Sequence, residues 1–189
     1  MGKVMWSQGQ VYTIDPAADL DTLLTEQMAW EQINSHFAAD LAGIYHRMGL
    51  NGFKRMKRYQ SIKENKESAE LRHYLIDYMD ILPTENFAYV SPTLVASLKD
   101  GLNLDHTLCS ENIVRLNRIM ELSLSGNSYS VIPMVDGLIK KENKRLVKIK
   151  REYIECEFAG WDNTYMMMHD KALHKMYKCK EKKAYGWKK

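Results

Sequence analysis

The sequence predicts an all-α protein in which long helices pack as an antiparallel four-helix bundle. Three observations support this class: only 4 Pro and 10 Gly interrupt 189 residues, 45% of the residues are hydrophobic, and apolar residues recur at spacings of three and four along most of the chain. Few helix breakers favour long helices over short strands, and the apolar content is sufficient for one core. We therefore expect a single domain over residues 1–189.

The N-terminal half is predicted to contain two long helices. Residues 1–15 show no period and are expected to form an extended arm. Asp15-Pro16 resembles a helix start, because a capping carboxylate is followed by Pro in the first turn. The first helix then continues to residues 49–52, where two Gly end it, and the second helix covers about residues 53–81.

The C-terminal half is predicted to add two long helices and a short one. Residues 84–90 have no clear period and are interpreted as a crossover. Ser91-Pro92 resembles the start of the third helix, which ends at the turn cluster 125–128. Pro133 lies in the first turn of the fourth helix, and a short fifth helix leads into a basic tail at 180–189. Four amphipathic helices bury their apolar stripes best as a bundle.

Acidic residues interrupt the apolar stripes near the middle of each long helix. Glu31 lies on the edge of the first stripe, Glu64 and Glu67 lie three apart in the second, and Asp105 and Glu142 lie on the apolar faces of the third and fourth. Burying several carboxylates requires compensation. Oxygen-rich sites suit Mg, Mn and Fe, and helical bundles build di-iron sites from inward carboxylates.

A simpler interpretation of the same acidic residues stays open. Each one can lie at the edge of its stripe and lean into water, or pair with a basic neighbour. Lys63, Lys66 and Arg72 are available beside Glu64 and Glu67.

Basic residues are concentrated in two parts of the chain. From Lys171 to Lys189 there are eight Lys against Asp170 and Glu181. A second cluster comprises Lys140, Lys141, Lys144, Arg145, Lys148, Lys150 and Arg151. Such runs usually form a solvated helix face or tail; the alternative is contact with nucleic acid, a membrane surface or another acidic partner.

Two further features bear on the class of protein. No apolar run approaches the roughly 18 residues that a membrane span requires, and the N-terminus lacks the apolar core of a secretion signal. Cys109, Cys156 and Cys179 form no CxxC pair. We therefore expect free thiols in a reducing cytoplasm.

The junction between the first two helices resembles that of a known family. Gly49-Leu50-Asn51-Gly52-Phe53 is similar to the GLxGF junction of bacterial non-haem ferritins, and Ile33-Asn34 with Phe37 is weakly similar to their first helix. The resemblance extends over about residues 20 to 175. It implies a ferritin-like four-helix bundle with a long crossover and a short C-terminal fifth helix.

With the junction as anchor, the acidic residues fall at or near the iron ligands of the family. Glu31 takes the place of the first-helix glutamate, and Glu64 that of the first residue in the second-helix Glu-x-x-His pair. Asp105 and Glu142 fall within a residue or two of the third- and fourth-helix carboxylates. The sequence departs from the family at Glu67, which replaces the His, and at Asp105, which is shorter than Glu.

The resemblance implies that two non-haem Fe²⁺ ions bind between these five residues, are oxidised by oxygen in a ferroxidase reaction, and pass to the cavity of a shell of many identical copies. Glu67 leaves the site without an imidazole unless His106 or His73 turns inward. An all-carboxylate site can hold iron, but its redox tuning differs, which puts the ferroxidase reaction in question.

Two other functions stay open at this point. The chain can be a metal-free ferritin-like structural or interaction module whose acidic residues pair with Lys and Arg. It can also associate with nucleic acid, as the DNA-protecting relatives of ferritin do. In that case Lys178, Lys180, Lys182 and Lys183 of the tail would contact phosphate.

Overall fold

The computed structural model describes residues 17–83, 92 and 95–186, which form five α-helices and contain no strand. The helices are α1 (Leu20–Arg47), α2 (Asn51–Met79), α3 (Leu98–Ser125), α4 (Ile132–Phe158) and α5 (Asn163–Ala184). The predicted arm, residues 1–15, lies outside the described residues. The predicted basic tail begins as helix, because its first residues belong to the last turns of α5. Within the described part of the chain, no helix is apolar over a length that could cross a membrane.

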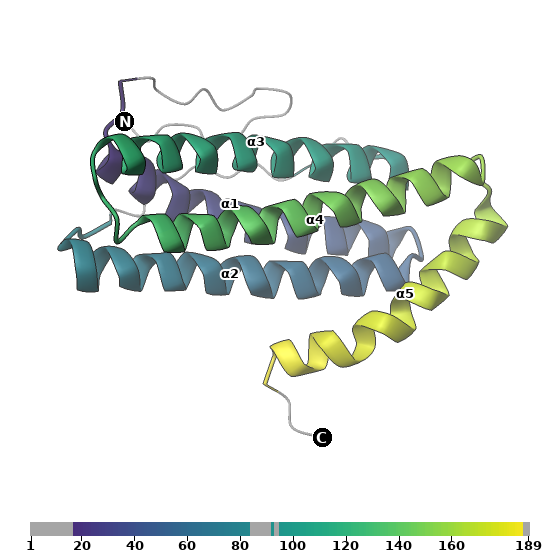
Figure 1. The fold of residues 1–189 in the computed structure, drawn as a ribbon. Helices are drawn as coiled ribbons and strands as arrows, with labels where there is room; N and C mark the ends of the chain where they lie inside the picture. The colour runs from purple at the N-terminus through teal and green to yellow at the C-terminus, as the bar shows by residue number, and fades with distance from the viewer. Residues whose placement is uncertain (1–16, 84–91, 93–94, 187–189) are drawn as a thin grey trace.

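The helices α1 to α4 lie alongside one another as a bundle, and α5 turns back at an angle to contact α2 (Figure 1). α2 ends at one end of the bundle and α3 begins at the other. The predicted crossover, residues 84–90, lies outside the described residues. The backbones pack most closely in the pairs α1/α2, α3/α4, α1/α3 and α2/α5. The pair α2/α4 is not among these, and a pocket described below lies between those two helices.

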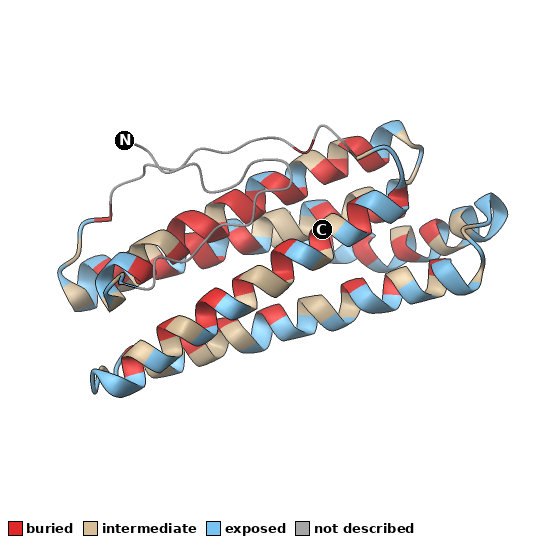
Figure 2. Cartoon of the chain, turned by 90° about the horizontal axis from the view of Figure 1, so that it is seen from above, coloured by how far each residue is buried: buried red, intermediate tan, exposed pale blue. Residues whose placement is uncertain are grey.

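Two apolar clusters fill the bundle, one toward each end. The cluster near the α1–α2 turn includes Phe37 and Phe53, and the cluster near the opposite end includes Leu24 and Leu75. The buried residues face the interior of the bundle, and exposed residues lie on its outer faces (Figure 2). The middle of each long helix falls between the clusters, which is where the sequence places its acidic residues.

The helix starts agree with the sequence prediction only in part. Pro133 lies in the first turn of α4, as predicted. α1 begins one residue after Asp19, whose carboxylate accepts a backbone hydrogen bond in the first turn; the predicted start at Asp15-Pro16 lies outside the described residues. α3 begins after Ser97, which caps it in the same way, and not at Ser91-Pro92. The Ser-Pro signal is ambiguous because the fixed φ of Pro also suits an extended connection.

The α1–α2 junction is shaped by contact with α5. The carboxylate of Asp170 on α5 accepts hydrogen bonds from the N–H groups of Gly52, at 2.7 Å, and Phe53, at 2.9 Å. These are N–H groups that the first turn of α2 cannot satisfy itself, and no side chain of the α2 N-cap residue does so. A Cβ added to Gly52 would lie 2.0 Å from the backbone oxygen of Asp170. The glycine therefore allows α5 to approach closely enough to cap α2.

We expect Gly52→Ala to destabilise the protein by about 2 kcal/mol or more, because the added methyl group meets backbone, which cannot move aside easily. Gly137→Ala is the matched control: it lies within α4, and nothing lies within 4 Å of its added Cβ. That change should stabilise the protein by roughly 0.5–1 kcal/mol through helix propensity. Denaturant unfolding of both variants measures the difference, and equal effects would contradict the close approach of α5.

Candidate metal centre

All five predicted acidic residues are buried in the polar layer between the two apolar clusters. Glu31, Asp105 and Glu142 are at most 3% exposed, Glu64 is 3% exposed and Glu67 is 7% exposed. They come from α1, α2, α3 and α4. One part of the simpler interpretation, in which these side chains lean into water, is therefore wrong. Its other part, pairing with basic residues, is confirmed for Glu64, Glu67, Asp105 and Glu142.

Three of the five carboxyl groups lie close together. Glu31, Glu64 and Glu67 each offer an oxygen, and these oxygens lie within 4.8 Å of one another. Glu31 Oε1 accepts hydrogen bonds from Gln27 Nε2 at 2.6 Å and Asn112 Nδ2 at 3.3 Å. Neutral amides are its partners, and no Lys or Arg among the described residues forms an ion pair with Glu31. We call Glu31, Glu64 and Glu67 the carboxylate trio.

The trio contains acceptor oxygens without a donor. Glu31 Oε2 and Glu64 Oε2 are buried and receive no hydrogen bond from the described residues. Burial, followed by the charge of Glu142, raises the pKa of Glu31 to about 7. Burial likewise raises the pKa of Glu64 well above its ordinary value. A proton shared between Glu31 and Glu64 satisfies these oxygens, and a single cation bound to the trio would satisfy them in its place.

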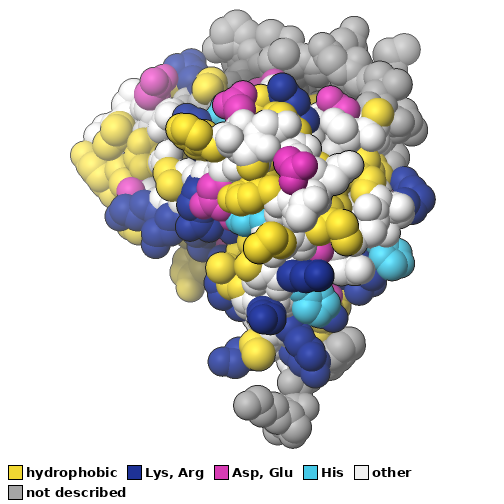
Figure 3. Space-filling model, turned by 90° about the vertical axis from the view of Figure 1, so that its right-hand side faces the viewer, with side chains coloured by type: hydrophobic (Ala, Val, Ile, Leu, Met, Phe, Trp, Pro, Cys, Tyr) yellow, Lys and Arg dark blue, Asp and Glu magenta, His cyan; other side chains and the backbone are white. Residues whose placement is uncertain are grey.

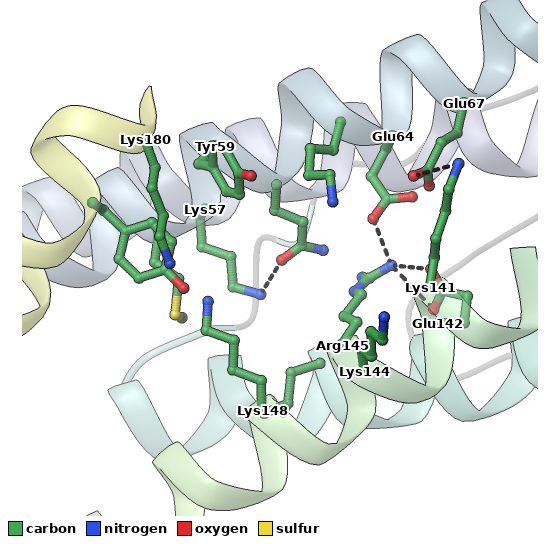
Figure 4. Close-up of a pocket in the computed structure, with 15 residues that line it drawn as sticks. Lys57, Tyr59, Glu64, Glu67, Lys141, Glu142, Lys144, Arg145, Lys148 and Lys180 are labelled. Atoms are coloured by element: carbon green, nitrogen blue, oxygen red, sulfur yellow. Dashed lines mark hydrogen bonds and ion pairs between the residues drawn. The ribbon is translucent and has the colours of Figure 1, made fainter. Parts of the chain in front are cut away.

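The other two carboxyl groups face an arginine. Arg145 Nη1 donates to Glu64 Oε1 at 3.1 Å and to Glu142 Oε1 at 3.2 Å, and Nη2 donates to Asp105 Oδ1 at 3.0 Å. Figure 4 shows the guanidinium group between Glu64 and Glu142. Burial opposes the charge of Arg145, but Glu142, Glu64 and Asp105 together raise its pKa well above the ordinary value. One fixed cation therefore neutralises carboxylates from three helices.

Two lysines complete the neutralisation. Lys57 is fully buried and pairs with Asp105. Burial would raise the pKa of Asp105, but Lys57 and Arg145 outweigh it and lower that pKa below its ordinary value. On the other side of the layer, Lys141 Nζ lies 3.2 Å from Glu67 Oε1. The layer thus contains five acidic and three basic groups. Glu31 is the acidic group that forms no ion pair within the described residues.

The predicted dinuclear arrangement of the five residues is not what the described residues form. Glu31, Glu64 and Glu67 come together, whereas Asp105 and Glu142 are turned to Arg145. The basic cluster of α4 is not solvated throughout, because the side chain of Arg145 is only 9% exposed. The ion-pair partners found for Glu64 and Glu67 are Arg145 and Lys141 of α4, and not Lys66 or Arg72 of α2 itself.

No imidazole joins the trio among the described residues. His73 is exposed, and His106 lines a separate hollow next to Ile149 and Tyr153. The sequence contains an indication that Arg145 points inward, because Arg145 follows Glu142 by three residues and so lies on the same helix face. Lys57 carried no comparable signal.

The basic tail residues lie on the C-terminal part of α5. Lys178, Lys182 and Lys183 are exposed, and the Lys180 ammonium lies 5.1 Å from the centre of the Tyr177 ring. Figure 3 shows Lys and Arg side chains gathered on the lower part of the end face, toward the C-terminus.

We expect Arg145→Met to destabilise the protein by about 3–5 kcal/mol at pH 8, because it leaves three buried carboxylates without their shared cation. The loss should shrink as the pH falls toward 5, since Glu64, whose pKa burial already raises, takes up a proton and no longer needs the cation. Arg145→Lys is the control that keeps the charge but cannot bridge three partners, so it should lose less. Urea unfolding at several pH values checks this. A pH-independent loss would contradict the assigned role of Arg145.

Comparison with known proteins finds similarity in structure but not in sequence. No family model matches the chain, and no curated protein matches it. A ferritin of Archaeoglobus fulgidus engineered into a closed form aligns with a TM-score of 0.77 and 13% identity, over 86% of this chain and 97% of that one. The open-pore ferritin of the same archaeon aligns with a TM-score of 0.78 and 13% identity, over 82% and 94% of the two chains.

A humanized archaeal ferritin gives the same result, with a TM-score of 0.78 and 12% identity over 86% of this chain and 96% of that chain. Identities this low establish the fold and nothing finer. The prediction of the bacterial non-haem branch of the family stays a prediction. The chain has the ferritin-like fold: a four-helix bundle with a long crossover and a fifth C-terminal helix.

Proposed function

We propose that this protein is a ferritin-like iron-binding protein whose interior centre takes one hard divalent cation per chain, with Fe²⁺ as its cargo. The observation that supports this is the carboxylate trio, in which two buried oxygens have no donor. Carboxylates are the ligands that hard cations prefer. Glu31, Glu64 and Glu67 would hold the ion, and its charge would replace the shared proton.

Arg145 argues for one ion and against two. A second ion between Asp105 and Glu142 would have to displace a guanidinium that already satisfies both carboxylates. The geometry therefore favours a one-ion centre over the dinuclear site that the resemblance implies.

This stoichiometry bears on the oxidation chemistry. Fe²⁺ gives up one electron on oxidation, whereas reduction of oxygen to hydrogen peroxide takes two. A centre with one iron cannot supply both electrons at once. We propose binding and transfer of iron to storage, with slow oxidation, in place of a fast ferroxidase reaction.

A metal-free structural module is the second candidate, and the same layer favours it in one respect. Arg145, Lys57 and Lys141 offset most of the acidic charge, and a proton held between Glu31 and Glu64 lowers the remaining negative charge without any metal. The two candidates differ in a measurable way, because only the first requires an ion to bind the trio.

We expect one Mn²⁺ or Fe²⁺ to bind per chain in oxygen-free buffer at pH 7.5, measured by calorimetry and, for Mn²⁺, by electron paramagnetic resonance. Glu31→Gln and Glu64→Gln should abolish this binding, and Glu70→Gln should retain it, because Glu70 lies on α2 but is largely exposed. Since the ion competes with the proton on Glu31, affinity should fall as the pH drops below about 7.

Absence of stoichiometric binding in the folded wild-type protein would leave the metal-free module as the function. Binding of two ions per chain would contradict the role assigned to Arg145. Glu31→Gln gives a second check, because it mimics the protonated carboxyl and should remain folded at pH 7.5.

We also propose that the chain assembles with copies of itself in the cytoplasm. Large apolar side chains are exposed on both sides of the α4–α5 turn: Phe158 is 90% exposed, Met168 67% and Met167 60%. Exposed apolar groups of this size typically mark an interface. Cys109, Cys156 and Cys179 are free, which suits a reducing compartment. Nothing in the comparisons supports nucleic-acid binding by the tail, and we do not propose it.

Native mass spectrometry should give a mass that is a multiple of the 22.0 kDa chain. Phe158→Asp combined with Met168→Asp should lower the number of subunits, because the charged groups resist burial. A monomeric wild-type protein at micromolar concentration would contradict self-assembly. It would leave the metal prediction unaffected, since the trio lies within one chain.

A further inference from the structure

A pocket of about 360 Å³ lies between α2, α4 and α5, and its charge is strongly unbalanced. Seven of its lining residues are Lys or Arg and three are Glu. All three Glu, together with Arg145 and Lys141, belong to the carboxylate end described above. The opposite end is formed by Lys57, Lys148 and Lys180, with the rings of Tyr59 and Tyr177 beside them. We call this part the lysine end.

The three ammonium groups of the lysine end come from three different helices. Figure 4 shows Lys148 of α4 pointing toward Lys57 of α2, with Lys180 of α5 extending into the same space. The Lys148 Nζ lies 4.0 Å from the centre of the Tyr177 ring, and the Lys180 Nζ lies 5.1 Å from it. The ring face offers a weak attraction to both cations, but it carries no net charge to balance them.

The described residues supply little negative charge at this end. Lys57 pairs with Asp105, but Asp105 is shared with Arg145. Lys148 forms no ion pair with a described carboxylate. Burial and then the charge of Lys57 lower the pKa of Lys148 to about 7, with a further contribution from Lys180, and the carboxylate of Glu152 opposes them only in part. Cations held together in this way gain from any anion that enters between them.

We propose that the lysine end of this pocket binds a small inorganic oxyanion of the phosphate class. Such an anion accepts hydrogen bonds on every side, so Lys148 of α4 and Lys180 of α5 can both donate to it. Lys57, which is buried and donates to Asp105 and Gln60, adds positive charge behind them. The pocket is large enough for roughly ten water volumes, so it can hold the ion with part of its hydration. Its concave form between three helices suits a compact ion. Lys180 is the exposed lysine of the tail that lines the pocket, whereas Lys178, Lys182 and Lys183 do not line it.

The proposal does not depend on the metal centre, and it is tested without metal. Full-length protein in buffer with chelator at pH 7.5 is titrated with inorganic phosphate by calorimetry. Its Tm is compared in phosphate and in chloride at equal ionic strength. We expect saturable phosphate binding and a higher Tm in phosphate. Lys148→Met should weaken phosphate binding by about tenfold or more, since it removes one charge-assisted contact.

The variant is chosen so that loss of binding cannot be mistaken for loss of folding. Because Lys148 forms no ion pair with a carboxylate of the described residues, Lys148→Met should be at least as stable as wild type in chloride, while phosphate no longer raises its Tm. Lys150→Met is the matched control: it makes the same substitution at an exposed position on α4 outside the pocket, and it should respond to phosphate as wild type does.

Three results would overturn the proposal. The first is an equal effect of phosphate and chloride on wild-type protein. The second is an equal phosphate response of Lys148→Met and wild type. The third is Lys148-dependent binding of a short single-stranded oligonucleotide together with no binding of free phosphate, which would identify a nucleic-acid contact instead.

Discussion

Carboxyl groups buried at the middle of a helical bundle must be neutralised there, and the interior of this protein is organised around that requirement. Water cannot reach Glu31 or Asp105, which are fully buried. Each buried charge therefore needs a proton, a basic side chain or a metal ion. Arg145 bonds to three of the five groups, Lys57 and Lys141 reinforce it, and Glu31 has amide partners and the neighbouring Glu64 but forms no ion pair within the described residues. The layer thus combines one part held by ion pairs with another in which burial favours a bound proton.

A short distance away, the same pocket has an excess of positive charge at its lysine end. α4 contributes Arg145 to the carboxylates and Lys148 to the lysine end of the pocket, one turn further along the helix. α5 closes that end with Lys180, and it is held in place because Asp170 caps α2 at Gly52. The glycine in the junction motif therefore has a physical role beyond the turn, since it sets how near α5 comes to the pocket.

Fold and chemistry separate clearly in this chain. The archaeal ferritins share its backbone arrangement at 12–13% identity, but a shared fold does not carry a shared reaction. The functional inference has to come from the side chains. Here an arginine lies among the carboxylates and forms ion pairs with three of them.

The sequence by itself determined the helical class, the five helices and the inward direction of the five acidic residues, because periodicity within a helix is a local property. The sequence determined the helix starts less well, because several Asp and Ser residues near the start of a helix can serve as its N-cap. In the structure Asp19 and Ser97 fill that role. Only the tertiary structure decided which charges meet. The contacts from Arg145 to Glu64, from Lys57 to Asp105 and from Asp170 to Gly52 join residues 48 to 118 positions apart. Helix packing alone sets such distances, and no spacing along one chain segment encodes them.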